Sequence, residues 1–195
     1  DELIEAAPVV KREAINYFGD EELYAEHFFD HARHIEVQVL ADHFGNLVIV
    51  GERDCSVQRR YQKVLEESPS TFITQKTREA LFGTAERIVR KIGYTSAGTL
   101  EFLVDEDQKP WFLEMNTRIQ VEHPVTEEIT GIDLVEQQIY IAAGNEMELR
   151  QKDIRFKGHA IEARLYAEDP EKDFLPSPGN ILAYFQPNLP GIRID

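Results

Sequence analysis

The stretch from Phe112 to Pro124 constrains the fold of this chain more than any other. In an extended strand, alternate side chains point to opposite faces. One parity of the stretch is apolar and comprises Leu113, Met115, Ile119 and Val121. The other parity is polar and comprises Glu114, Asn116, Arg118, Gln120 and Glu122. The alternation predicts a strand with one face on a core and one functional face, although a solvated strand with mixed charges would show the same pattern.

A second extended run, residues 97–104, precedes this stretch. If the two runs form a hairpin, Val104 faces Trp111 and Glu101 faces Glu114. Two carboxylates directly opposite each other on a sheet repel. A divalent cation between the carboxylates would remove that repulsion.

The chemistry of this hairpin points to a hard metal ion. Glu101, Glu114 and Asn116 offer only oxygen donors, which Mg²⁺ and Mn²⁺ prefer. Protein-bound Mg²⁺ usually also takes phosphate oxygens from a nucleotide. The hairpin therefore predicts nucleotide-phosphate chemistry.

Length and charge limit the function classes. The 195 residues suffice for one large or two small domains, and no apolar run reaches the length of a membrane span. The formal net charge of −15 would repel nucleic acid and anionic membranes. A single cysteine, Cys55, and the absence of a visible signal peptide favour a cytoplasmic protein, or a mitochondrial matrix protein in a eukaryote.

Periodicity gives a mixed set of elements with a boundary near residue 150. Helices are predicted at 1–20, 74–92 and 131–143. Strands are predicted at 23–29, 34–40, 47–50, 97–104, 112–124, 159–166, 181–185 and 192–195. The polar residues 51–64 are expected to form a solvated surface loop. Three histidines, His27, His31 and His34, have a helical spacing that would suit zinc, but a strand starting at His34 favours hydrogen-bonding roles instead.

Five ordered motifs resemble the biotin carboxylase component of biotin-dependent carboxylases, in the ATP-grasp superfamily. They occupy residues 33–40, 52–60, 114–127, 158–164 and 174–179. The resemblance implies an α+β fold, with the C-terminal part of an ATP-grasp domain, an antiparallel sheet with helices, in residues 1–150. The start of a β-rich biotin carboxylase C-terminal domain would follow in residues 151–195. The family's N-terminal domain and glycine-rich phosphate loop would precede Asp1, so we expect a fragment with little activity of its own.

The resemblance also implies a reaction and its residues. MgATP and bicarbonate would form carboxyphosphate, which carboxylates the ureido nitrogen of carrier-bound biotin. The implied metal ligands are Glu101, Glu114 and Asn116. The implied bicarbonate and biotin residues are Lys63, Arg118, Gln120, Val121, Glu122 and Arg164, with Glu122 as the base and Arg164 stabilising carboxyphosphate and the biotin enolate. The implied nucleotide contacts, besides Glu101 and Glu114, are Glu26, His27, Phe28, Phe29, His34, Gln58 and Tyr61. His27 and Tyr61 depart from the residues usual in the family.

Further implications concern partners and alternatives. A biotin carboxyl carrier and a carboxyltransferase would be partners, and the full protein would be a homodimer or part of a larger complex, with no nucleic acid or membrane partner. A ligase resembling the carbamoyl phosphate synthetase large subunit, or a non-catalytic ATP-grasp module, are alternatives. The segments Arg59–Lys63 and Phe174–Gly179 favour biotin carboxylase over carbamoyl phosphate synthesis. The sequence leaves the acyl acceptor open.

Overall fold

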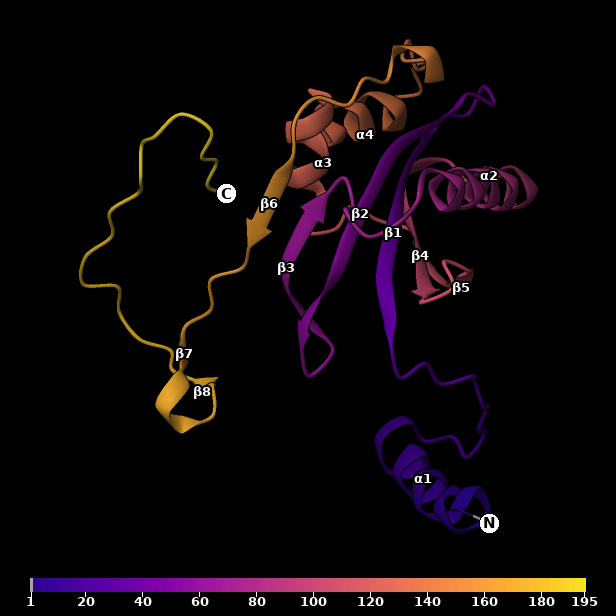
Figure 1. Cartoon of the computed structure of the whole chain (residues 1–195), viewed down its shortest axis with the longest axis vertical. Coiled ribbons are helices and arrows are strands. Elements are labelled where there is room, and N and C mark those ends of the chain that lie inside the picture. The colour runs from indigo at the N-terminus through magenta and orange to yellow at the C-terminus, as the bar shows by residue number, and fades with distance from the viewer. Residues whose placement is uncertain (1) are drawn as a thin grey trace.

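A computed structural model describes residues 2–195 and shows an α+β fold built on one antiparallel sheet (Figure 1). The sheet has six strands in the order β5-β4-β1-β2-β3-β6. Their bounds are β1 Ala32–Ala41, β2 Leu47–Arg59, β3 Gln62–Ser68, β4 Ser96–Asp105, β5 Pro110–Asn116 and β6 Ala160–Ala163. A separate two-stranded pair consists of β7 Glu168–Asp169 and β8 Leu175–Pro176. The α+β fold predicted from the sequence is confirmed.

Four α-helices accompany the sheet in residues 2–195. Their bounds are α1 Glu2–Phe18, α2 Gln75–Ile92, α3 His123–Thr130 and α4 Leu134–Ala142. Two short 3-10 helices, η1 Gln151–Asp153 and η2 Pro170–Lys172, lie in the C-terminal part. None of the helices in the described part of the chain is both long and apolar enough to span a membrane.

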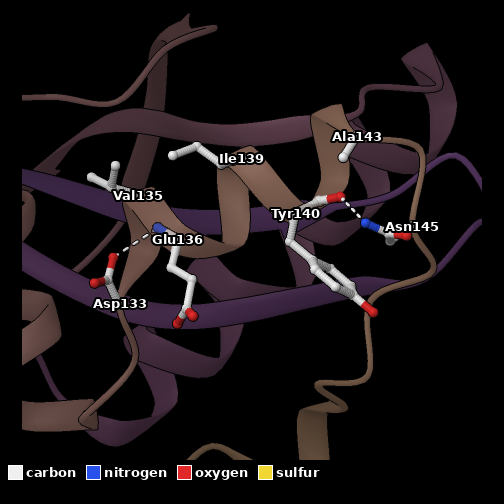
Figure 2. Close-up of a pocket in the computed structure, with 7 residues that line it drawn as sticks. All are labelled: Asp133, Val135, Glu136, Ile139, Tyr140, Ala143 and Asn145. Atoms are coloured by element: carbon white, nitrogen blue, oxygen red, sulfur yellow. Dashed lines mark hydrogen bonds between the residues drawn. The ribbon is translucent and has the colours of Figure 1, made fainter.

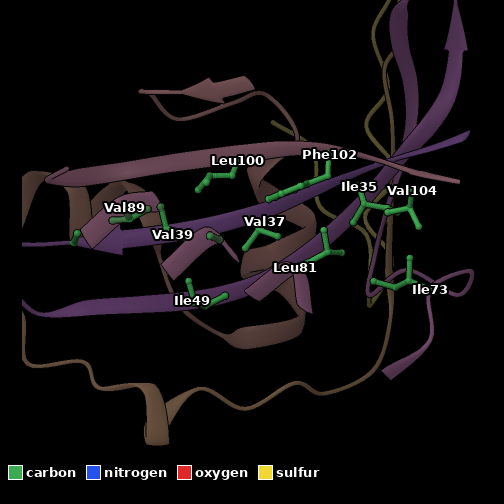
Figure 3. Packing of buried hydrophobic residues seen from close by; sticks show 12 residues of the cluster. Ile35, Val37, Val39, Ile49, Ile73, Leu81, Val89, Leu100, Phe102 and Val104 are labelled. Atoms are coloured by element: carbon green, nitrogen blue, oxygen red, sulfur yellow. The ribbon is translucent and has the colours of Figure 1, made fainter. Parts of the chain in front are cut away.

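The helix α2 covers one face of the sheet because its apolar stripe matches that of β1. Ile35, Val37 and Val39 of β1 are fully buried in one cluster with Leu81 and Val89 of α2 (Figure 3). The hydroxyl of Thr74 caps the start of the helix by accepting a hydrogen bond from the Thr77 amide. Gly93 ends it in a left-handed conformation, as the sequence predicted.

The opposite face of β1 is polar in its first half and apolar at its end. Leu40 joins a second apolar cluster with Leu134 and Ile141 of α4. His34, Glu36 and Gln38 share the parity of Leu40 and therefore lie on that same face. The second cluster thus closes one end of the face, and the polar side chains occupy the rest.

The prediction of a solvated loop at residues 51–64 is wrong. This segment is the end of β2 and the start of β3, joined by a turn at Arg60 and Tyr61, both with positive φ. Its charged residues Glu52, Arg53 and Asp54 are buried, in the part of β2 that is paired to both β1 and β3. A run of charged residues in the sequence does not show whether the fold brings residues of opposite charge next to it, and so does not predict whether the run is buried.

Other predicted elements also differ from the structure. Residues 23–29, 181–185 and 192–195 form no strand. The predicted strand around the opening motif ends at Asn116, and the helix α3 that follows was not predicted. A proline in its first turn and Gly131 at its end are the sequence signals for α3.

The hairpin of β4 and β5 has the predicted carboxylate pair, but its register near the turn differs from the prediction. Glu101 lies opposite Glu114, as predicted, whereas Trp111 faces Leu103 and not Val104. A bulge between Glu101 and Phe102 leaves one extra residue on β5 and shifts the register. The same bulge explains why Leu113, predicted to pack a core, is 41% exposed.

The two end segments of the chain differ in their relation to the sheet. The helix α1 has no buried residue and stands away from the strands in Figure 1. Beyond 150, β6 pairs with β3 and so extends the same sheet. The boundary near residue 150 stays a prediction.

Candidate active site

Lys63 is the centre of a buried charge cluster on the polar face of the sheet. Its Nζ donates hydrogen bonds to Glu36 Oε1, to Glu101 Oε1 at 3.1 Å and to Glu122 Oε1 at 2.8 Å. Burial alone would lower the pKa of Lys63, but the charge of Glu36 and the hydrogen bonds with Glu122 and Glu36 outweigh burial and raise the pKa. Lys63 therefore stays a cation and holds three carboxylates together.

The fully buried guanidinium of Arg53 lies beneath this cluster. It donates two hydrogen bonds to Glu36 Oε2, at 3.1 and 3.2 Å. Its other acceptors are Gln38 at 2.8 Å, Gln120 at 3.0 Å, Thr126 at 3.1 Å and Thr99 at 3.2 Å. Arg53 thus joins β1, β2, β4, α3 and the loop before α3 in one network.

Sequence reasoning placed neither Glu36 nor Arg53 in the site. Both residues lie within motifs noted in the sequence, but their roles depend on pairing between strands. Glu36 faces Arg53 on β2 and Glu101 on β4 in the register of the sheet. The sequence signal for Glu36 was its parity, which places it on the same face of β1 as His34 and Gln38. The charged residues that it faces belong to two other strands.

The predicted metal residues come together at the β4–β5 hairpin. Asn116 Nδ2 donates to Glu101 Oε1 at 2.9 Å and to Glu114 Oε1 at 3.0 Å. His34 Nε2 lies 2.7 Å from Glu101 Oε2. Burial alone would raise the pKa of Glu101, but the hydrogen bond and charge of His34 and those of Lys63 lower it to about 2. Glu101 is therefore ionised at neutral pH, as a metal ligand must be.

These three side chains fit a hard divalent cation. Two carboxylates stand opposite each other, and the amide of Asn116 points at both. Because the amide oxygen and nitrogen of Asn are nearly equivalent in shape, a flip would replace the donor with the oxygen Oδ1. The donor set would then consist of oxygens alone, which suits Mg²⁺.

Glu122 lies between two cations at the other end of the cluster. Its Oε1 accepts from Lys63 at 2.8 Å, and its Oε2 accepts from the Arg164 guanidinium at 2.7 Å. Burial alone would raise the pKa of Glu122, but the hydrogen bond and charge of Lys63, together with the charge of Arg53, lower it. Glu122 is a carboxylate at neutral pH and able to accept a proton.

Gln120 and Glu122 do not reach this site through strand alternation. They lie in the loop and turn between β5 and α3. Gln120 is drawn in by Arg53 and by its own donation to Glu101 at 2.7 Å. Both side chains lie in the charge cluster, but the predicted strand geometry is wrong because β5 ends at Asn116.

Arg118, Val121 and Tyr61 remain outside the cluster. Arg118 is exposed, and its guanidinium contacts only the Ile119 carbonyl, at 3.2 Å, within the described residues. Val121 is 60% exposed and Tyr61 is 93% exposed. In the described part of the chain, no hydrogen bond or ion pair joins these three side chains to Lys63 or Glu122.

The predicted nucleotide-contact residues fall into two groups. His34 and Gln58 are hydrogen-bonded to each other, with Gln58 Nε2 3.0 Å from His34 Nδ1, at the edge of the cluster. His27 and Phe29 pack around Trp111, with ring centroids 6.1 and 5.3 Å from it. Glu26 and Phe28 are exposed. Among the described residues, His27 and His31 take part in no metal-binding group, whereas His34 groups with Glu36 and Glu101.

A separate cavity of about 450 Å³ lies on α4, away from the charge cluster (Figure 2). It is lined by Asp133, Val135, Glu136, Ile139, Tyr140, Ala143 and Asn145. The side chains of the charge cluster are absent from its wall, so the cavity is not the candidate site.

Comparison with known proteins gives one family and several close relatives. Residues 1–150 match the family model described as the carbamoyl-phosphate synthase L chain, ATP binding domain. The chain is 58% identical over 183 residues to biotin carboxylase 2 of Bacillus subtilis, covering 94% of this chain and 41% of that protein. It is 54% identical over 177 residues to the propionyl-CoA carboxylase alpha chain of Ruegeria pomeroyi, covering 91% of this chain and 26% of that protein.

A solved structure agrees with these relatives. The biotin carboxylase domain dimer of the Hydrogenobacter thermophilus 2-oxoglutarate carboxylase, in complex with MgADP, ADP and bicarbonate, superposes with a TM-score of 0.92. The two chains are 49% identical, and the match covers 98% of this chain and 42% of the other. The chain thus spans less than half the length of the relatives that it matches.

Proposed function

Because the chain belongs to the family of carbamoyl-phosphate synthase L chain ATP-binding domains, we propose that the full-length protein is an ATP-dependent biotin carboxylase. Relatives that are 50 to 58% identical and named biotin carboxylase support this choice within the family. Their match extends beyond residue 150, where the family model ends. In the proposed reaction, bicarbonate is activated by MgATP and the carboxyl group passes to biotin on a carrier.

The observation that carries the proposal is the position of Glu122. This carboxylate lies between the cations of Lys63 and Arg164, on the face of the sheet that also holds Glu101 and Glu114. Bicarbonate is an anion, and the two cations would attract it beside a carboxylate that can take its proton. Lys63 and Arg164 would bind bicarbonate and steady the carboxyphosphate charge, and Glu122 would be the base.

The hairpin would hold the metal ion on the nucleotide phosphates. Glu101, Glu114 and Asn116 are the proposed ligands of Mg²⁺ or Mn²⁺. When bound, such an ion neutralises charge on the phosphates of ATP. His34 and Gln58 are proposed as nucleotide contacts from the same side.

Arg118, Val121, Tyr61 and the segment from Glu26 to Phe29 are proposed to act only with bound substrates. Arg118 is free to turn, since it makes a single contact to a backbone carbonyl within the described part of the chain. Its guanidinium, together with Gln120 and the Val121 backbone, would complete the bicarbonate site. Glu26 to Phe29 and Tyr61 would border the nucleotide.

The proposed partners and location follow from the proposed reaction. A biotin carboxyl carrier and a carboxyltransferase would accept the carboxyl group, and the related domain from Hydrogenobacter thermophilus is a dimer. We propose that the full-length protein forms a dimer within such a complex. The single buried Cys55 supports a reducing, cytoplasmic location.

The proposal is tested by assaying the full-length protein for fixation of labelled bicarbonate onto free biotin with ATP. We expect ATP- and bicarbonate-dependent carboxybiotin formation in the wild type. The variant Glu122→Gln cannot accept the proton, and we expect it to lose about 10²- to 10⁴-fold in kcat. The control Glu128→Gln, on the exposed side of α3, should keep wild-type activity.

The alternative within the family is carbamoyl phosphate synthesis, and the family description itself favours testing it. Both reactions activate bicarbonate with ATP, so ATP hydrolysis alone does not separate them. The same preparation is therefore assayed for carbamoyl phosphate with ammonia as nitrogen donor. Carbamoyl phosphate without carboxybiotin would overturn the biotin carboxylase assignment.

A further inference from the structure

Two glutamates next to Arg164, Glu66 and Glu162, take no part in the proposed chemistry. Glu66 of β3 lies directly opposite Glu162 of β6 in the sheet register. Glu66 is 1% exposed. One oxygen of each, Glu66 Oε2 and Glu162 Oε2, is buried without a hydrogen-bond partner among the described residues. Two ionised carboxylates in these positions would repel each other and leave two buried acceptors unsatisfied.

A single proton shared by the two residues removes both problems. If Glu162 carries the proton, its hydroxyl can donate to the free oxygen of Glu66. Neighbouring carboxyl groups that cannot both ionise are a known arrangement in proteins. Burial and the negative charge of Glu66 together outweigh the opposing charge of Arg164 and raise the pKa of Glu162 to about 7. Burial also raises the pKa of Glu66, although Arg164 opposes the change.

The pair is coupled to the candidate base through Arg164. Arg164 Nε donates to Glu66 Oε1 at 2.7 Å, and its terminal nitrogen donates to Glu122 Oε2 at 2.7 Å. The guanidinium is planar and rigid, so anchoring Nε fixes the direction of the terminal nitrogens. The backbone amide of Arg164 is fixed as well, by the Val64 carbonyl at 3.0 Å.

The charged surroundings of the pair come from the elements packed against β3 and β6. The helix α3 packs against both β3 and β6. The charged groups that act on the pair are Arg164, Glu122, Glu36 and Arg53. The other titratable groups on these elements are Lys63 and Glu67 of β3 and His123, Glu127 and Glu128 of α3. Lys63 and Glu67 have partners elsewhere, namely the site carboxylates and His159.

We propose that Glu66 and Glu162 are positioning residues, which share one proton and hold the Arg164 guanidinium against Glu122 for the reaction with biotin. The role of the pair in the reaction with biotin rests on the proposed function. Loss of the shared proton creates a second carboxylate that competes with Glu122 for the guanidinium. The biotin reaction therefore slows as the pH rises through neutrality.

The kinetic test uses the full-length protein and compares kcat/KM for free biotin with kcat/KM for bicarbonate between about pH 6 and about pH 9, on either side of the range in which Glu162 titrates. Glu162→Gln mimics the neutral acid and should abolish the decline in the biotin parameter above neutral pH. Glu66→Gln removes a charged anchor of Arg164 and should lower the biotin parameter about tenfold at every pH, and more than the bicarbonate parameter.

The matched control is Glu67→Gln, the same change at the next position of β3. Glu67 faces Ile161 in the register and pairs with His159 at 3.1 Å. This variant should keep the wild-type pH profile. A Glu162→Gln profile identical to the wild type would overturn the positioning role and leave the proposed function standing.

An infrared measurement tests the shared proton without any turnover. The wild type should show the carbonyl band of a neutral carboxylic acid that titrates near neutral pH, and Glu162→Gln should lack it while Glu67→Gln keeps it. Absence of the band in the wild type, or its persistence in Glu162→Gln, would overturn the proton-sharing pair. Absence of carboxybiotin formation in the wild type would refute the proposed function and the biotin step. The infrared band would still show whether Glu66 and Glu162 share a proton.

Discussion

At the scale of single residues, the candidate site is a balance of buried charges. Glu36, Glu101 and Glu122 surround Lys63, and the fully buried Arg53 forms an ion pair with Glu36. Each charge depends on its partner, because a buried ion without a counter-ion is very costly. The same residues that would perform the chemistry therefore also hold the sheet together.

Replacing Arg53 tests this dependence. Arg53→Met removes the counter-ion of Glu36 and leaves several buried acceptors without a donor, and we expect a loss of about 3 to 5 kcal/mol in the free energy of unfolding. Denaturant unfolding followed by circular dichroism measures the change. The control is Arg90→Met in α2, where the exposed pair with Glu86 contributes only about 0.3 to 0.5 kcal/mol. Equal effects of the two substitutions would contradict a structural role for the buried guanidinium.

The proposed metal ligands make a second prediction at this scale. The double variant Glu101→Gln with Glu114→Gln replaces both carboxylates of the hairpin by neutral amides, so the affinity of the full-length protein for Mg²⁺ with ATP should fall strongly. Isothermal titration of MgATP measures the loss. A control with Glu106→Gln, at the exposed end of the hairpin, should bind as the wild type does. Unchanged binding in the double variant would refute the metal assignment.

At the scale of elements, irregularities in the strands decide where the side chains point. A bulge lies between β1 and β2, where Gln38 faces Gly51 and Val39 faces Ile49. Gly51 has φ +113, and an added Cβ would lie 2.8 Å from Phe156 Cε1. This glycine allows β2 to continue past the bulge, so that Arg53 faces Glu36.

Gly51→Ala should therefore destabilise the protein, both by backbone strain and by the clash with Phe156. We expect a loss of about 1 to 3 kcal/mol in the free energy of unfolding. The matched control is Gly83→Ala within α2, where the new methyl group meets only Arg87 at 3.5 Å. That change should stabilise the protein by about 0.5 to 1 kcal/mol, because alanine is the better helix former. Thermal unfolding should show shifts of opposite sign, and a tolerated alanine at 51 would contradict the close contact.

At the scale of the whole molecule, the site carboxylates make stability depend on pH. The pKa of Glu101 is lowered from 4.5 to about 2, and that of Glu122 is lowered as well. A lowered pKa in the folded state means that the stabilisation is fully present above pH 4.5 and is lost as the pH falls toward 2.

Acid titration without divalent metal should therefore unfold the protein progressively below pH 4.5. Far-ultraviolet circular dichroism as a function of pH measures this transition. In Glu101→Gln, part of the pH dependence should disappear, since one of the titrating groups is gone. An identical acid transition in that variant would show that Glu101 does not contribute the expected stabilisation.

Much of the site could be predicted from residue types and spacing. The carboxylate pair Glu101 and Glu114 followed from two strands in one hairpin, and the family resemblance of the long motifs implied Lys63, Glu122 and Arg164. The role of Arg53 could not be predicted, because a charged residue in a polar stretch reads as exposed until its partners from other strands are known. The helix α3 was missed for a related reason, since the alternation of residues 118–122 fits a strand locally and only the loop after Asn116 breaks it.

The sequence by itself determined the helix α2, the strand pair at the hairpin and the metal-type donor set around the opening motif. Local periodicity and turn residues suffice for these features because they involve neighbours in the chain. Only the tertiary structure decided that Lys63 and Arg164 meet at Glu122, that Arg53 pairs with Glu36, and that Glu162 faces Glu66. Those meetings depend on strand order and on the irregular pairing of β2 with β1 and with β3, which sets long-range register and leaves little trace in local sequence patterns.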